Sequence, residues 1–173
     1  LHFSDDPVGG IIENVDLAIH FGERSPVGPW VSREITKVRI WAVASKTYLA
    51  SRGVPRTVDD LRSHALLSWE CPGEDGKLWP LLSGGSTAVS PILIARHIHL
   101  LRQFALANLG IALVPDAMLP DPGVQEGELV SVLPTVIGKE VGIRVVVPAV
   151  LSEIPRIKAL IELLRPFLGE LRL

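Results

Sequence analysis

His97 and His99 are the first residues whose type and spacing could do chemistry, because two histidines can begin a metal site. On a helix, residues two positions apart point about 200° away from each other, so these side chains would not chelate one ion together. His64 and Cys71 could supply further ligands, but no paired C-x-x-C or H-E-x-x-H spacing supports that. We therefore expect no bound metal.

Two pairs of adjacent carboxylates, Asp5-Asp6 and Asp59-Asp60, could serve acid–base chemistry. The second pair follows Thr57 at the spacing of a capping box, in which a hydroxyl and a carboxylate accept free backbone N–H groups. Negative charge is also favoured in the first turn of a helix, and adjacent side chains diverge there. We expect a structural role for both pairs.

Signatures of the common enzyme and nucleotide sites are absent from the sequence. Ser86 lies in Gly84-Gly85-Ser86-Thr87, which lacks the G-x-S-x-G pattern of a nucleophile elbow. Neither G-x-G-x-x-G nor the Walker phosphate loop occurs, and residues 73–77 have the wrong glycine spacing for one. The sequence therefore predicts a protein that is not an enzyme and that holds no cofactor.

Composition narrows the class of protein further. The 173 residues are 47% hydrophobic, enough for one domain or two small lobes, and their formal net charge of −2 predicts no attraction to nucleic acid. The single cysteine, Cys71, favours a reducing compartment. No signal peptide or membrane-length apolar run occurs, so we expect a cytoplasmic location and no membrane partner. The sequence starts at Leu1 rather than at Met, and we expect a fragment of a longer protein.

Hydrophobic patterning in the first half of the chain predicts short strands and helices. Residues 15–19 form an apolar run typical of a buried strand, and residues 31–45 contain two β-rich stretches. A helix is predicted over 46–51, ended by Gly53, and a second one from Thr57 to about His64. A strand over 66–69 and a turn-rich connection or hairpin around Trp79 are predicted to follow.

The second half predicts a similar alternation. Apolar residues recur at helical spacing over about 97–108, and short strands are predicted over 111–114, 129–133 and 142–147. The final helix has Ser152 as its expected N-cap and Pro155 in its first turn, and Pro166 is expected to kink or end it. This alternation indicates an α/β fold with largely parallel sheets. The tryptophans are expected to pack in the interior, with Trp30 and Trp69 the two that could touch a ligand.

Four segments, in this order, resemble the C-terminal regulatory domain of LysR-type transcriptional regulators. The family patterns are "DLAIR-G", "VASPAYLA…G-P…DL…H", "GLGIALLP" and "G-L-V-VLP". The corresponding stretches of this chain are residues 15–22, 43–64, 109–115 and 127–134. Their common order over most of the chain makes the resemblance much more specific than any one segment alone.

The chain departs from the family pattern at four places. His20 stands where the family commonly has Arg, and Lys46 where it has Pro. Arg96-His97 replaces the common Asn-Asp, and Asn108 replaces the first glycine of the "GLG" turn. Asparagine tolerates the left-handed conformation, so the turn is still expected. Because these positions surround the expected pocket, the resemblance does not identify the effector.

The resemblance implies an α/β, two-lobed fold like that of type 2 periplasmic binding proteins, in which two crossing strands join the lobes. Lobe one would comprise residues 1–44 and 143–173, and lobe two residues 45–142. The family's first strand and helix, and its winged helix-turn-helix DNA-binding domain, would then lie before Leu1.

The resemblance also implies a ligand site between the lobes, at strand ends and helix N-termini, where free N–H groups attract anions. A guanidinium at Arg96 could pair with a carboxylate, while His20 and His97 could exchange hydrogen bonds near neutral pH. As alternatives, His97 would only cap its helix and Arg96 would be a solvated strand end. The expected effector contacts are Ser4, Asp5, His20, Phe21, Gly22, Ser45, Arg96 and His97.

The function implied is that of an effector sensor. A small metabolite, with organic anions the favoured class, would control DNA binding by the N-terminal domain of a homodimer or homotetramer. The alternative is a periplasmic-type solute-binding protein for transport or chemosensing, which has the same two-lobed design.

Overall fold

The computed structural model describes residues 15–22, 27–70, 74–115 and 128–169, with side chains described up to residue 164. Within it the chain forms two compact units. Unit 1 consists of residues 1–38 and 141–173, and unit 2 of residues 39–140. Ser4 and Asp5, both expected effector contacts, lie outside the described residues.

Unit 1 is built on an antiparallel pair of strands. Strand β1 (Ala18–Phe21) pairs with β9 (Lys139–Pro148), with Ala18 opposite Val146 and Phe21 opposite Ile143. The turn η2 (Ala149–Leu151) and helix α3 (Pro155–Gly169) follow β9. Apolar side chains from β9 and α3 make the core of this unit, namely Val145, Val147, Ile157 and Ile161.

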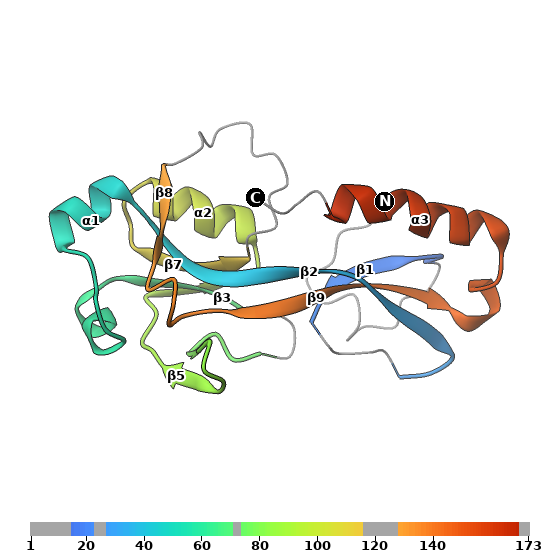
Figure 1. The fold of residues 1–173 in the computed structure, drawn as a ribbon, viewed down its shortest axis with the longest axis horizontal. Coiled ribbons are helices and arrows are strands. Elements are labelled where there is room, and N and C mark those ends of the chain that lie inside the picture. The colour runs from blue at the N-terminus through green and yellow to red at the C-terminus, as the bar shows by residue number, and fades with distance from the viewer. Residues whose placement is uncertain (1–14, 23–26, 71–73, 116–127, 170–173) are drawn as a thin grey trace. The chain divides into compact units, whose positions relative to one another are not determined.

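Strands β2 (Trp30–Ser45) and β9 both continue from one unit into the other. They are neighbours in one sheet and run side by side in Figure 1. The two β-rich stretches predicted over 31–45 are therefore one strand of 16 residues. Its first half is mostly exposed or half-buried, and its last four residues are buried.

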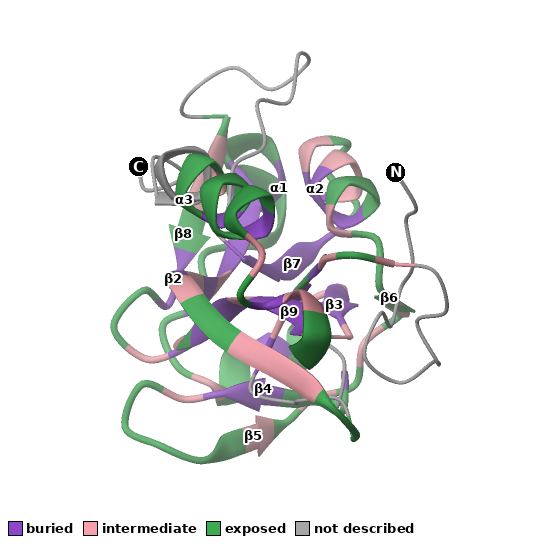
Figure 2. Cartoon of the chain, turned by 90° about the vertical axis from the view of Figure 1, so that its right-hand side faces the viewer, coloured by how far each residue is buried: buried purple, intermediate pink, exposed green. Residues whose placement is uncertain are grey.

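Unit 2 surrounds the second half of β2 with short elements. In chain order these are α1 (Lys46–Arg52), η1 (Asp59–Ser63), β3 (Leu66–Trp69), β4 (Leu78–Pro80), β5 (Ser86–Ala88), β6 (Leu93–Ala95), α2 (Ile98–Leu106), β7 (Ile111–Pro115) and β8 (Leu129–Val132). Strands β3 and β7 are buried along their whole length and make the centre of the core (Figure 2).

The sheet is mixed, so the prediction of largely parallel sheets was wrong. Strand β3 runs parallel to both β6 and β7, whereas β7 and β8 run antiparallel to β2. Helix α2 carries the chain from β6 to β7, and such a crossover returns the chain in the same direction. The inference from alternating strands and helices to parallel pairing is therefore correct for these strands. It is wrong for the long strands β2 and β9.

The predicted hairpin around Trp79 is present as the antiparallel pair β4–β5. The indole of Trp79 is fully buried, and its Nε1–H donates to the Ser68 hydroxyl at 2.6 Å. The hairpin is thereby fixed to β3 by a buried hydrogen bond.

The N-terminus of α3 differs from its prediction. Ser152 does not cap this helix, because its hydroxyl donates to the Ala149 carbonyl and closes η2 instead. The helix begins at Pro155 and continues through Pro166 to Gly169, so it does not end at that proline.

The turn between α2 and β7 needs two special residues. Asn108 adopts the left-handed conformation, with φ of 64°, as predicted. A Cβ on Gly110 would lie 2.4 Å from the carbonyl oxygen of Ala65, so only glycine fits there. That close approach lets the Ile111 N–H donate to the same carbonyl at 2.9 Å and starts the pairing of β7 with β3.

Candidate functional site

A polar cluster of unit 2 lies where the parallel strands β3 and β6 end. Trp69 is opposite Ala95 in the register, and the Glu70 N–H donates to the Ala95 carbonyl at 3.0 Å. Arg96 directly follows the last residue of β6. Parallel pairing therefore places Glu70 and Arg96 side by side at the same edge of the sheet.

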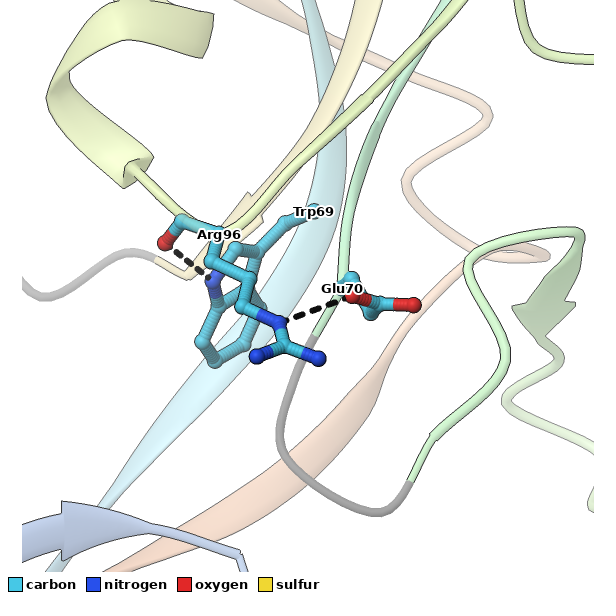
Figure 3. A network of polar contacts seen from close by, with 3 residues as sticks. All are labelled: Trp69, Glu70 and Arg96. Carbon is cyan, nitrogen blue, oxygen red and sulfur yellow. Dashed lines mark hydrogen bonds and ion pairs between the residues drawn. The ribbon is translucent and has the colours of Figure 1, made fainter. Parts of the chain in front are cut away.

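Arg96 is held at two points in this cluster (Figure 3). Its Nε donates to Oε2 of Glu70 at 2.8 Å, and its carbonyl accepts the indole N–H of Trp69 at 3.1 Å. Trp69 is buried, whereas the Arg96 and Glu70 side chains are 48% and 37% exposed. The backbone is thus fixed by the core, while the ion pair faces water and is weak enough to be rearranged by a ligand.

Glu70 was not among the predicted site residues. A recognisable strand over 66–69 precedes it, but β6 has only three residues, none of them buried. Because β6 was not predicted from the sequence, there was no strand register from which the pairing of Glu70 with Arg96 could be inferred. The position of Glu70 directly after a buried strand was the only available signal.

His97 caps helix α2. Its Nδ1 accepts the Leu100 N–H at 3.2 Å, which places the proton of the neutral ring on Nε2. The capping role weighed from the sequence is therefore present, and contact with a ligand stays a prediction. The ring of His99 is 6.2 Å away, edge to face. No group of three or more potential metal ligands is found among the described residues.

Ser45 occupies the equivalent position at the start of α1. Its Oγ accepts the Tyr48 N–H at 3.0 Å and donates to Oδ1 of Asn108. Among the described residues, Ser45 makes these side-chain hydrogen bonds and none to Arg96 or His97. The structure thus brings Arg96 and His97 together at the start of α2 and places Ser45 at the start of α1.

The predicted contacts in unit 1 lie at the end of β1. His20 is buried, and its Nδ1 lies 3.0 Å from the Phe21 carbonyl, to which the Nδ1–H tautomer would donate. Gly22 has φ of 94°, and its N–H donates to the Gly142 carbonyl at 2.9 Å. The strand therefore ends in a turn that favours glycine, next to a half-buried Phe21.

Comparison with known proteins gives a consistent result. A family model described as "LysR substrate binding domain" matches residues 1–169. The HTH-type transcriptional regulator CrgA of Neisseria meningitidis serogroup C is 31% identical over 132 residues, which are 75% of this chain and 43% of the relative. The chain thus spans less than half the length of this curated relative.

Solved structures of regulatory domains have the same fold. The CrgA regulatory domain from Neisseria meningitidis matches with a TM-score of 0.78 at 26% identity, over 96% of this chain and 81% of that one. The regulatory domain of AphB in Vibrio vulnificus matches with a TM-score of 0.65 at 24% identity, over 84% and 73%. These matches confirm the predicted α/β fold of the type 2 periplasmic-binding-protein class. In the described part of the chain, no helix is long and apolar enough to cross a membrane.

Proposed function

The chain belongs to the LysR substrate-binding domain family, and from this premise we propose that it senses a small metabolite and controls DNA binding by a separate domain of the same regulator. The relatives that carry this domain are helix-turn-helix transcriptional regulators, which supports the regulator over the solute-binding protein considered from the sequence. Their role in transcription also favours binding over catalysis.

Our proposed effector contacts come from both units. Unit 1 contributes His20, Phe21 and Gly22, and unit 2 contributes Ser45, Arg96 and His97. Ser4 and Asp5 remain proposed contacts. The two compact units correspond, in this proposal, to the two lobes of the family fold.

One observation supports a class of effector: the guanidinium of Arg96 is half-exposed where β3 and β6 end. A guanidinium presents donors in a planar fork that matches a carboxylate or phosphate. Because Trp69 fixes the Arg96 backbone, this donor group projects from a rigid edge. We therefore propose an organic anion as the effector.

The signal would arise from differential binding. A ligand shifts a conformational equilibrium only by its difference in affinity for the two states. In the proposed mechanism, the effector changes the balance between arrangements of a cytoplasmic homodimer or homotetramer. That balance sets how the paired DNA-binding domains meet the promoter, with no membrane partner involved.

Calorimetric titration of the full chain with a panel of small organic anions tests this function. We expect at least one member to bind, and Arg96→Ala to weaken it about tenfold, as expected for a charge-assisted hydrogen bond. Arg56→Ala is the matched control, since it removes an exposed arginine of the same unit. Equal losses in both variants would remove Arg96 from the effector site.

A further inference from the structure

A separate pocket of about 290 Å³ opens within unit 2, between η1 and strand β5. None of its lining residues belongs to the proposed effector contacts. They are Val58, Asp59, Leu61, Arg62, His64, Leu66, Thr87, Ala88, Val89 and Ser90. At liquid density this volume holds about ten water molecules, so it suits a ligand of roughly ten non-hydrogen atoms.

Apolar side chains make up half of the lining. Leu61 and Leu66 are only 1% and 2% exposed, so they form the core behind the pocket and leave little surface for a ligand. The half-buried Val58 and Val89 and the exposed Ala88 supply the apolar surface that a ligand can reach. Burial of an aliphatic group of a ligand against this surface is favourable, because it removes apolar area from water.

Two opposite charges line the same pocket. Asp59 and Arg62 are three residues apart on a 3₁₀ turn, where side chains at that spacing lie on one face. Oδ1 of Asp59 lies 3.3 Å from Nη2 of Arg62, and the side chains are 83% and 86% exposed. An ion pair this exposed is weak, so the charged groups of a ligand could replace each partner at little cost.

Asp59 differs from its neighbour in what its carboxylate does. The Asp60 carboxylate accepts the backbone N–H groups of Arg56 and Thr57 at 2.8 and 2.9 Å. These bonds lower the pKa of Asp60 and confirm the structural role predicted for it. The Asp59 carboxylate instead pairs with Arg62, and both residues line the pocket.

The remaining polar groups of the pocket are neutral. Burial lowers the pKa of His64, so its ring adds no third charge near neutral pH. Tyr48 Oη accepts the Ala65 N–H at 3.0 Å and lies 3.3 Å from Nδ1 of His64, to which its hydroxyl hydrogen can be donated. Thr87 and Ser90 contribute hydroxyl groups.

We propose that this pocket binds a small zwitterion of the α-amino-acid class with an aliphatic side chain. Its carboxylate pairs with Arg62, its ammonium group pairs with Asp59, and its side chain packs against Val58, Ala88 and Val89. One positive and one negative partner beside an apolar wall match this class, whereas a simple anion would meet the Asp59 carboxylate as well. The domain would thereby receive a second input, distinct from the effector bound near Arg96.

Titration of the ¹⁵N-labelled full chain with L-leucine, followed by NMR, tests the proposal. We expect amide shifts in η1 and β5, and about tenfold weaker binding in both Arg62→Ala and Asp59→Asn. Glycine lacks the aliphatic group, 4-methylpentanoate lacks the ammonium group and 3-methylbutylamine lacks the carboxylate, so each should bind more weakly than leucine. Lys158→Ala removes another surface ion pair, with Glu153 in unit 1, and should leave leucine binding unchanged.

Three results would overturn the proposal. The first is the absence of leucine-dependent shifts in η1 and β5. The second is equal binding of 4-methylpentanoate and leucine, which would make the pocket an anion site. The third is unchanged leucine binding in both charge variants, whose folding can be verified from their amide spectra because both substituted side chains are exposed.

Discussion

The hydroxyl of Ser45 donates a hydrogen bond to the side-chain carbonyl of Asn108. This bond joins the start of α1 to the turn that follows α2, two segments separated by 63 positions in the sequence. Asn108 therefore serves twice, through its side chain and through its left-handed backbone, whose φ is 64°. The glycine that the family commonly has at this position would supply only the second of these.

Substitution of Asn108 should separate the two contributions. Asn108→Gly keeps the backbone conformation and loses the hydrogen bond, so we expect a loss of about 1 kcal/mol in the free energy of unfolding. Asn108→Ala also forces an alanine into the left-handed region, which adds about 1–2 kcal/mol. Urea unfolding of the full chain measures both values, and equal stabilities of the two variants would contradict the backbone argument.

Gly110 gives a prediction about space rather than conformation. An alanine there would bring its Cβ within 2.4 Å of the Ala65 backbone oxygen, so Gly110→Ala should lower the free energy of unfolding by about 3 kcal/mol. Gly53→Ala is the control, since Gly53 has φ of 89° and no atom near its virtual Cβ. The control should show backbone strain alone, which costs about 1–2 kcal/mol. A larger loss at Gly53 than at Gly110 in thermal or urea unfolding would show the steric argument to be wrong.

Removing the negative charge beside Arg96 should favour anionic ligands. Glu70→Gln preserves the shape of the side chain that Arg96 contacts at 2.8 Å. An exposed ion pair contributes up to about 1 kcal/mol, so we expect about fivefold tighter binding of an organic anion identified with the wild-type chain. Calorimetric titration of wild type and variant provides the comparison. Weaker binding by the variant would instead indicate that Glu70 itself contacts the effector.

The lowered pKa of His64 predicts how the free energy of unfolding changes with pH. Burial lowers this pKa below the ordinary value of 6.5, so the unfolded chain takes up a proton before the folded chain does. The contribution of the neutral, buried ring to the free energy of unfolding is therefore fully present above pH 6.5. It decreases as the pH falls from 6.5 towards the folded-state pKa.

His64→Gln should reduce this pH dependence. Urea unfolding over the acidic side of pH 6.5 should give a shallower decrease for the variant than for wild type. The slopes are compared rather than the absolute stabilities, because the variant also changes the contact with Tyr48. If the free energy of unfolding falls with pH equally in both proteins, a group other than His64 causes the decrease.

Local signals in the sequence predicted many of the elements. The capping box at Thr57 marks η1, and the apolar spacing around Leu101 marks α2. These signals are short-range and need no knowledge of the sheet. By contrast, the parallel strands β3 and β6 place Glu70 beside Arg96, and a pairing register is a long-range property. Three-residue strands such as β6 carry too little periodicity to be recognised.

The two ends of α3 show how a local preference can be satisfied in more than one way. Ser152 has the residue type of an N-cap, but the same hydroxyl can close a turn on the preceding carbonyl, as it does with Ala149. Pro166 ordinarily interrupts a helix, yet α3 continues to Gly169. The residue types of Ser152 and Pro166 therefore did not by themselves fix where the helix begins and ends.

The division of the chain has a consequence for its synthesis on the ribosome. Unit 2 is one continuous segment, residues 39–140, so all of its strands can pair before residues 141–173 have been translated. Strand β1 is made earlier, but its neighbour in the sheet is β9, so it must wait for that strand to emerge. Domains that emerge first generally fold first. The vectorial order of translation thus favours completion of unit 2 before β9 is available to pair with β1.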